Sequence, residues 1–186
     1  EFRRVLFRSG ETVHLGPQRR IADSDLQYDF PREAGAQAPG DPFERFARAG
    51  ARRLALDTRP GQDRNGVPWF PYRGAAEDGG LWMTSDTLVL SRWGDTPLEI
   101  VHRWRAPEAI DAVLDIRLDP SGRSEDGVTL HVWQDGAPLI EREIAETVAL
   151  STRIEMARGG TLEISVGPNG SARGDVVGYR FTLSRP

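Results

Sequence analysis

Side chains in the C-terminal two-thirds of the chain alternate between apolar and polar with a period of two residues. In the range 112–118, Leu114 and Ile116 alternate with Asp115 and Arg117. A helix would place Leu114 and Ile116 on different sides, whereas an antiparallel strand with one buried face places them together. This stretch therefore predicts a strand that presents its apolar face to a core.

The same alternation recurs along the chain between turns rich in Gly, Pro and Asp. The predicted strands lie at 53–57, 81–90, 99–105, 112–118, 128–133, 139–144, 147–156, 162–166 and 179–183. Short strands at regular spacing, with no helices between them, favour an all-β antiparallel sandwich, or jelly roll, over a βαβ fold. We expect its two sheets to bury Leu114, Ile116, Leu130, Ile164 and Phe181.

One segment, Asp41–Gly50, carries helix signals. Asp41 is a good N-cap, and Pro42 fits the first helical position. Helical spacing would place Phe43 and Phe46 on one face. Two to three turns do not persist alone, so we expect a single short N-terminal helix that docks on one end of the sandwich.

Three parts make up the predicted domain organisation. Residues 1–9, EFRRVLFRS, resemble the translation of a short-read sequencing adapter, and we interpret them as non-biological. Residues 10–40 contain an Ala-, Gly- and Pro-rich stretch and are interpreted as an incomplete N-terminal segment or linker. Residues 41–186 form the predicted β-sandwich domain, which is long enough for one core.

Composition excludes several classes of function. The net charge is −4, which gives a nucleic-acid partner no electrostatic support. No run approaches the roughly 20 apolar residues of a membrane-spanning helix. The chain has no cysteine, so disulfides, thiolate metal sites and a cysteine nucleophile are excluded.

The order of turns and strands in the C-terminal half resembles the galactose-binding-like jelly-roll modules of secreted bacterial proteins. The motifs are RWRAP at 103–107, EDGV at 125–128, GGTL at 159–162 and the closing segment 175–183. Such modules are often appended to glycan-acting enzymes. The resemblance implies a non-catalytic accessory module of an exported bacterial protein, extracellular or periplasmic, that binds carbohydrate or a cell-surface glycan.

Modules of this type sometimes hold a structural calcium ion, and the resemblance points to Asp126 and Asp175 as its ligands. The segment 119–126, DPSGRSED, does not fit an EF-hand loop, because Arg123 stands where an oxygen ligand is required. The alternative is that these acidic residues are turn residues in solvent.

Aromatic residues gather in and beside a long Gly- and Pro-rich loop. The predicted ligand-binding residues are Trp69, Phe70, Tyr72, Arg73 and Trp82. The apolar face of a sugar ring stacks on an indole, and its hydroxyls need a few fixed polar partners. The alternative is that the aromatic side chains close one end of the sandwich.

No pattern in the sequence supports catalysis. The three histidines lack the close spacing of a zinc site, and Glu141 and Glu143, although on one strand face, are typical of exposed carboxylates. Two alternatives stay open: a structural domain that packs against an upstream domain of the same chain, and a glycan hydrolase or lyase domain.

Overall fold

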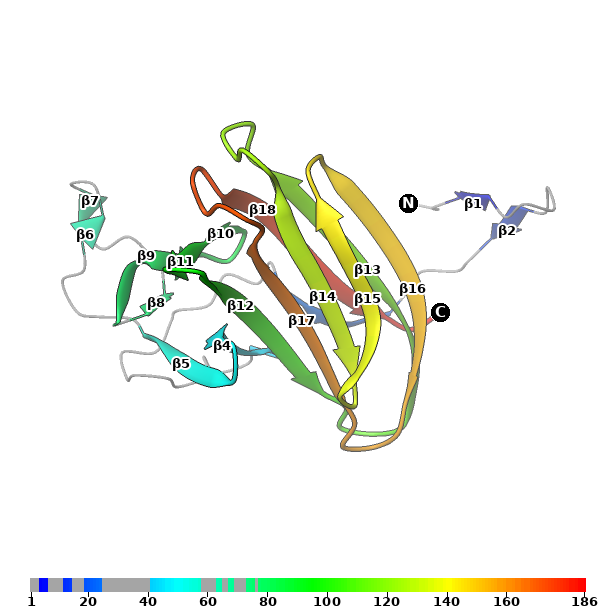
Figure 1. Cartoon of the computed structure of the whole chain (residues 1–186). Coiled ribbons are helices and arrows are strands. Elements are labelled where there is room, and N and C mark those ends of the chain that lie inside the picture. The colour runs from blue at the N-terminus through cyan, green and yellow to red at the C-terminus, as the bar shows by residue number, and fades with distance from the viewer. Residues whose placement is uncertain are drawn as a thin grey trace.

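The structure, a computed structural model, describes residues 4–6, 12–14, 19–24, 41–57, 63–64, 67–68, 73–75 and 77–186. All regular elements within these ranges are strands. Fourteen strands form one antiparallel sheet that folds over itself into two facing layers (Figure 1). The hairpins β1 (Arg4–Leu6)–β2 (Thr12–His14) and β6 (Asp63–Arg64)–β7 (Val67–Pro68) are separate from this sheet.

The first layer has the strand order β15-β14-β17-β12-β4-β5, with the short β11 paired to β12. Its strands are β4 (Glu44–Ala49), β5 (Arg52–Asp57), β11 (Ser91–Trp93), β12 (Thr96–Arg105), β14 (Val128–Gln134), β15 (Ala137–Ile144) and β17 (Thr161–Pro168). In Figure 1, β12, β17, β14 and β15 lie side by side in front.

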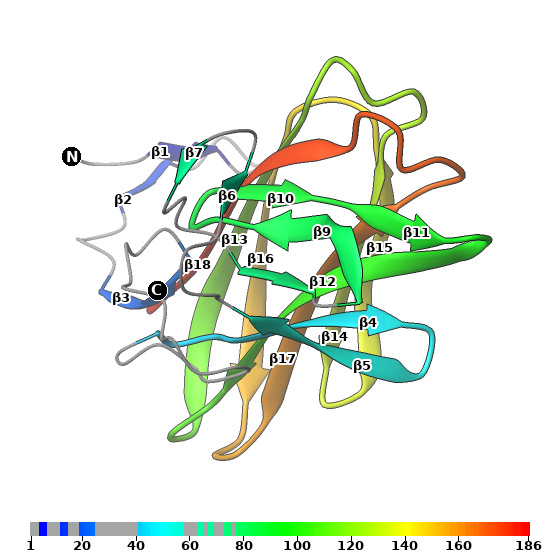
Figure 2. The same ribbon diagram turned by 90° about the vertical axis from the view of Figure 1, so that its left-hand side faces the viewer.

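The second layer has the strand order β16-β13-β18-β10-β9-β8, with β3 paired to β18. Its strands are β3 (Arg20–Asp23), β8 (Arg73–Ala75), β9 (Asp78–Met83), β10 (Thr87–Val89), β13 (Ile110–Pro120), β16 (Val148–Met156) and β18 (Val176–Ser184). The two layers join where β5 pairs with β4 on one edge and with β8 on the other (Figure 2).

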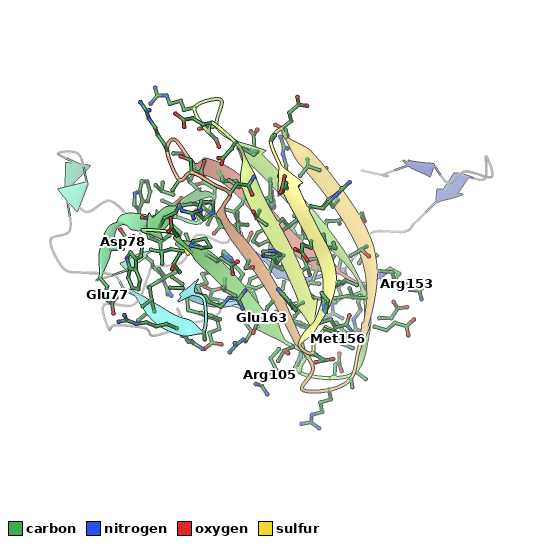
Figure 3. All side chains as sticks on the ribbon, viewed as in Figure 1. Glu77, Asp78, Arg105, Arg153, Met156 and Glu163 are labelled. Atoms are coloured by element: carbon green, nitrogen blue, oxygen red, sulfur yellow. The ribbon has the colours of Figure 1, made fainter. Side chains whose placement is uncertain are left out.

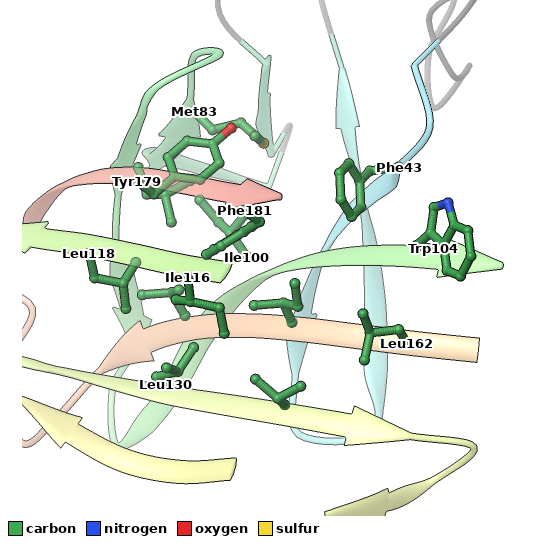
Figure 4. Close-up of a cluster of buried hydrophobic side chains, with 14 of the residues drawn as sticks. Phe43, Met83, Ile100, Trp104, Ile116, Leu118, Leu130, Leu162, Tyr179 and Phe181 are labelled. Carbon is green, nitrogen blue, oxygen red and sulfur yellow. The ribbon is translucent and has the colours of Figure 1, made fainter. Parts of the chain in front are cut away.

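The core between the layers confirms the predicted all-β sandwich. The predicted strands are present with bounds shifted by a few residues, except that the single strand predicted at 81–90 is two antiparallel strands, β9 and β10. The five residues expected inside, Leu114, Ile116, Leu130, Ile164 and Phe181, are all 1% exposed or less. Aromatic residues add to this core from β12 and β18 (Figure 4).

The helix expected at Asp41–Gly50 is wrong, because residues 44–49 form strand β4. β4 pairs with β12 on one edge and with β5 on the other. Phe43, Ala47 and Ala49 point into the core, which is a period of two rather than the helical period. Asp41 still caps the start of the element, since its Oδ1 accepts the Phe43 amide at 3.0 Å. Pairing on both edges therefore outweighs the local helix signals.

Two further segments contribute more to the sandwich than expected. β3 lies inside the predicted linker, yet it pairs with β18 and buries Ala22 and Asp23. The predicted irregular loop contains β8 and the start of β9, which pair with each other. Both segments are short and polar, so their alternation is too brief to identify from sequence.

A hydrogen-bonded group of polar side chains joins the layers inside the core. The Tyr179 hydroxyl, on β18, donates to the Thr84 carbonyl at 2.9 Å and accepts from Arg45 Nη1 at 3.0 Å. His102 Nε2, on β12, lies 3.3 Å from the same hydroxyl. Arg45 forms a fully buried ion pair with Asp41 at 2.9 Å. These contacts connect the two layers, while the buried Nδ1 of His102 has no hydrogen-bond partner among the described residues.

Burial lowers the pKa of His102 well below its usual value, and the positive charges of Arg45 and Arg73 lower the pKa further. His102 is 0% exposed, and it is packed edge-on between the rings of Phe43 and Phe181. The imidazole is therefore neutral in the folded protein. In the unfolded chain it binds a proton near its ordinary pKa of about 6.5.

We expect acid to destabilise the fold through His102. Because the folded pKa is depressed, the stabilisation is complete above about pH 6.5 and is lost as pH falls below that value. Between about pH 7.5 and about pH 5.5, the unfolding free energy of His102→Gln should fall by about 1 kcal/mol less than that of the wild type. Urea denaturation at both pH values measures this difference.

His102→Asn, which also removes the titratable ring, should show the same reduced acid dependence as His102→Gln. An unchanged acid dependence in His102→Gln would show that His102 does not link folding to protonation.

Candidate functional site

The outward surface of the first layer, hereafter the outer face, carries an array of polar and aromatic side chains that alternate with core residues. Its members are Glu44, Phe46, Arg48, Arg53, Glu99, Val101, Arg103, Arg105, Thr129, His131, Trp133, Glu141, Glu143, Glu163, Ser165 and Gly167. The strand register brings side chains from neighbouring strands together as rows across the layer. In Figure 3, Glu163 lies on this surface and Arg105 lies near one end of β12.

Arg48 connects three strands at the centre of the outer face. Its Nε and Nη2 donate to Glu99 Oε2, on β12, at 3.0 and 2.7 Å. Nη1 donates to Glu163 Oε2 and Nη2 to Ser165 Oγ, both on β17 and both at 3.3 Å. One guanidinium therefore fixes side chains from β4, β12 and β17 in one arrangement.

Glu99 depends on Gly167, its neighbour on β17. A Cβ at residue 167 would lie 2.9 Å from Glu99 Cγ, so any larger residue would displace this carboxylate. From its position over Gly167, Glu99 accepts from Arg48 and places Oε1 3.3 Å from Nδ1 of His131. The missing side chain thus lets one carboxylate reach from β12 to β14.

A second set of contacts surrounds Phe46 on β4. The guanidiniums of Arg53 and Arg103 lie over its ring, 4.0 and 4.8 Å from the centroid. Both arginines also bind Glu44, at 2.5 and 3.3 Å. Burial would raise the pKa of Glu44, but the hydrogen bond and charge of Arg53, with the charge of Arg103, outweigh it and lower the pKa. Glu44 is therefore held ionised.

Trp133 lies at the end of one cross-strand row. In the register, Trp133 faces Glu163, and Glu163 faces Arg103. Arg103 Nε donates to Glu163 Oε1 at 2.8 Å. Trp133 is partly exposed, and its ring centroid lies 6.4 Å from that of His131. The row places an indole beside hydrogen-bonding groups that are held by their own partners.

A shallow depression of about 460 Å³ lies where the outer face meets the loops at one end of the sandwich. Its lining residues are Asp126, Thr129, Glu143, Pro168, Asn169 and Gly170. Thr129 and Glu143 are cross-strand neighbours on β14 and β15. The Asn169 side-chain amide donates to the Asp126 carbonyl at 2.8 Å. The depression is thus polar, and carboxylates lie on two of its sides.

The predicted aromatic site is only partly covered by the structure. Trp69, Phe70 and Tyr72 lie outside the described residues. Arg73 on β8 is 2% exposed and faces the core beside the buried Met83, its partner in the register. Trp82 on β9 precedes Met83 and is partly exposed on the opposite side of the same strand. The structure therefore does not bring Arg73 and Trp82 together, and sugar contact by the aromatic loop stays a prediction.

The two predicted metal ligands lie close to each other. Asp175 is 2% exposed, and its Oδ1 accepts from Ser124 Oγ at 2.5 Å. Its buried Oδ2 has no hydrogen-bond partner among the described residues. Burial raises the pKa of Asp175, the Ser124 hydrogen bond opposes this, and the charge of Asp126 raises the pKa further. A cation bound here would compensate the buried charge of Asp175 and reduce its repulsion by Asp126.

Gly174 allows the loop that carries Asp175 to approach the loop after β13. Its φ is +80°, and a Cβ there would lie 2.1 Å from the Arg123 carbonyl oxygen. Within the described ranges, however, no group of three or more acidic or histidine side chains could hold a metal ion. Asp126 and Asp175 fit a calcium ion only if backbone or solvent oxygens supply its other ligands.

The chemistry of the outer face fits binding better than catalysis. Its central carboxylates, Glu44, Glu99 and Glu163, are each paired with arginine. A general acid needs a raised pKa, whereas that of Glu44 is lowered.

No helix in the described part of the chain has the length and apolar character needed to cross a bilayer.

Sequence reasoning identified the strands that carry the outer face, except β4, but not the site. The alternation already placed His131 and Trp133 opposite Leu130, and Glu99 and Arg103 opposite His102. No signal along the chain shows that these charges meet across strands. The register supplies that information.

Comparisons with known proteins give weak structural similarities to carbohydrate-binding modules. A family 35 module from Clostridium thermocellum has 11% identity and a TM-score of 0.33, over 52% of this chain and 87% of that chain. The C-terminal family 6 module of a marine laminarinase from Zobellia galactanivorans has 9% identity and a TM-score of 0.32, over 53% and 90%. A Podospora anserina β-(1,4)-mannanase with a family 35 module has 9% identity and a TM-score of 0.36, over 63% of this chain and 25% of that chain.

No protein-family model and no curated protein sequence matches the chain. At these TM-scores the structural similarities do not assign a ligand, so the function is argued from the outer face itself.

We expect the Arg103–Glu163 pair to stabilise the fold measurably. Both side chains are partly buried, so their attraction is screened less than that of an exposed pair. A double-mutant cycle with Arg103→Gln and Glu163→Gln should give a coupling of about 0.5 to 1 kcal/mol in chemical denaturation. The control is a cycle at the more exposed Arg153–Asp111 pair, which should couple less. Equal coupling at both sites would contradict a special role for the network.

Proposed function

We propose that this chain is a non-catalytic accessory module that binds carbohydrate through the outer face. The observation that carries the proposal is the row formed by Trp133, Glu163 and Arg103. It joins a partly exposed indole to hydrogen-bonding groups whose positions are fixed by ion pairs. This combination matches the apolar face and the hydroxyl groups of a sugar ring.

Rigidity of the outer face supports the same function. Sugar hydroxyls gain little net energy from hydrogen bonds unless the protein groups are already in place, since ordering side chains on binding costs free energy. Arg48 and Arg103 each contact at least two partners on neighbouring strands. A ligand would therefore meet a preorganised surface.

The cellular setting is also part of the proposal. We place the chain in an exported bacterial protein, outside the cytoplasm, beside a catalytic domain of the same polypeptide. This placement rests on the resemblance of the sequence motifs to modules of that kind. The structural-domain and enzyme alternatives become outcomes of the experiments below.

Trp133→Ala should weaken glycan binding by about tenfold or more, because an indole at the centre of a contact contributes more than its neighbours. Affinity electrophoresis in gels that contain soluble polysaccharides measures this change. The melting temperature of the variant should stay close to that of the wild type, because Trp133 is only partly buried.

Trp69→Ala and Trp82→Ala are the matched variants for the aromatic loop. Loss of binding in these variants, with normal binding in Trp133→Ala, would move the site to the loop. If the wild type binds none of the glycans, this result would support a structural domain instead. Turnover of a polysaccharide by the isolated chain would support the enzyme alternative.

We also propose that Asp126 and Asp175 contribute to a structural calcium site. The buried Oδ2 of Asp175 and the neighbouring charge of Asp126 support it. Calcium at about 100 times its dissociation constant should stabilise the wild type by about 2.7 kcal/mol, and Asp175→Asn should lose this gain. Thermal melts with calcium, magnesium and chelator measure the effect. A calcium response that survives in Asp175→Asn would place any site elsewhere.

A further inference from the structure

The outer face carries arginines that are already neutralised by the protein's own carboxylates. Arg48 is paired with Glu99 and Glu163, and Arg103 is paired with Glu163 and Glu44. Arg53 is paired with Glu44. The pairs of Arg48 and Arg103 use several of their five donors, and that of Arg53 uses Nη2. Three carboxylates thus balance the charges of the three arginines.

The remaining cations near this surface offer no anion site. Arg92, next to the depression, donates to the carbonyl oxygens of Gly94, Asp95 and Asn169. Arg105 has no ion pair with any described residue, but it lies exposed near the end of β12, where Thr161 is its neighbour in the register. Arginine often binds a carboxylate through two parallel hydrogen bonds, and an exposed ion pair such as Arg105 could form contributes little.

The depression at the other end of the outer face carries negative charge. Asp126 and Glu143 line it, and no arginine or lysine is among its lining residues. Glu141, further along β15, has one ion-pair contact within the described residues, with His131 at 3.8 Å. The electrostatic field at this end therefore repels anionic polymers. The exposed carboxylates remain solvated, so an ion pair with an exposed cation would contribute little binding free energy.

We infer that the ligand of the outer face is a neutral polysaccharide, and that uronic-acid and sulfated polymers are excluded. The inference rests on the proposed glycan-binding function and adds the charge class of the glycan. Neutral hydroxyls can use the lone pairs and N–H groups left over in the network without breaking an ion pair. To form a bidentate pair with Arg48, an anionic sugar would have to displace Glu99 or Glu163.

The test compares polymers of three charge classes by affinity electrophoresis and calorimetry: neutral mannan and β-glucan, anionic polygalacturonate, and cationic chitosan. Neutral binding should change less than about twofold between about 50 mM and about 500 mM sodium chloride, because no net charge is neutralised on binding. Tighter binding of polygalacturonate or chitosan, or a steep loss of affinity in salt, would overturn the inference while leaving glycan binding intact.

Glu163→Gln provides a second, more specific test. It removes one negative charge and leaves Arg48 and Arg103 partly uncompensated, so binding of polygalacturonate should rise and binding of neutral glycan should fall. Glu155→Gln, on the outward side of β16 in the second layer, makes the same chemical change away from the site. An equal rise in both variants would show an effect of overall charge and overturn the inference.

Failure of the inference and failure of the proposed function give different results. If no polymer binds to the wild type, the proposed function fails and the inference fails with it. If a charged polymer binds and Trp133→Ala abolishes its binding, the outer face is a glycan site but the charge class is wrong. Melting temperatures of all variants show whether each protein is folded when its binding is measured.

Discussion

Backbone pairing on both edges of β12 is the constraint on which the two surfaces of the first layer depend. β17 pairs with one edge and β4 with the other, so the register leaves each β12 side chain only two directions. Ile100 and Trp104 point into the core, and Glu99 and Arg103 point to the outer face. A shift of one residue would bury the charges and expose the core. The fold and the candidate site are therefore consequences of a single register.

Prediction from sequence succeeded where alternation is long and failed where a local signal competes with pairing. In 112–118 the alternation is unbroken, and the structure has the predicted strand as part of β13. At 41–50, Asp41 and Pro42 are good helix-start residues, and the helix prediction followed them. The same segment also alternates, with Ala47 and Ala49 inward and Arg48 outward. Contact with β12, more than 50 residues away in the register, decides between the two patterns.

The candidate site was not predictable from the sequence for a related physical reason. Arg48 and Glu163 are separated by 115 positions in the chain, and their contact exists only because β12 pairs with β4 on one edge and with β17 on the other. Exposed Arg and Glu are common on sheet surfaces, so their types alone indicate solvated charge. The aromatic loop was easier to notice because its residues are adjacent in sequence. Residues that are close in sequence therefore pointed to the aromatic loop, whereas residues that are close in the fold form the outer face.

The ion-pair network also accounts for two apolar residues that point outward from the sheet. Val101 is 0% exposed and Phe46 is 3% exposed, although both lie on the outer face. The guanidiniums of Arg53 and Arg103 cover Phe46, and the stems of such side chains shield apolar surface while their charges stay at the solvent boundary. The apolar surface beneath in turn excludes water from one side of the ion pairs, which strengthens them. The same arrangement therefore protects the sheet surface and holds the polar groups rigid enough to recognise a ligand.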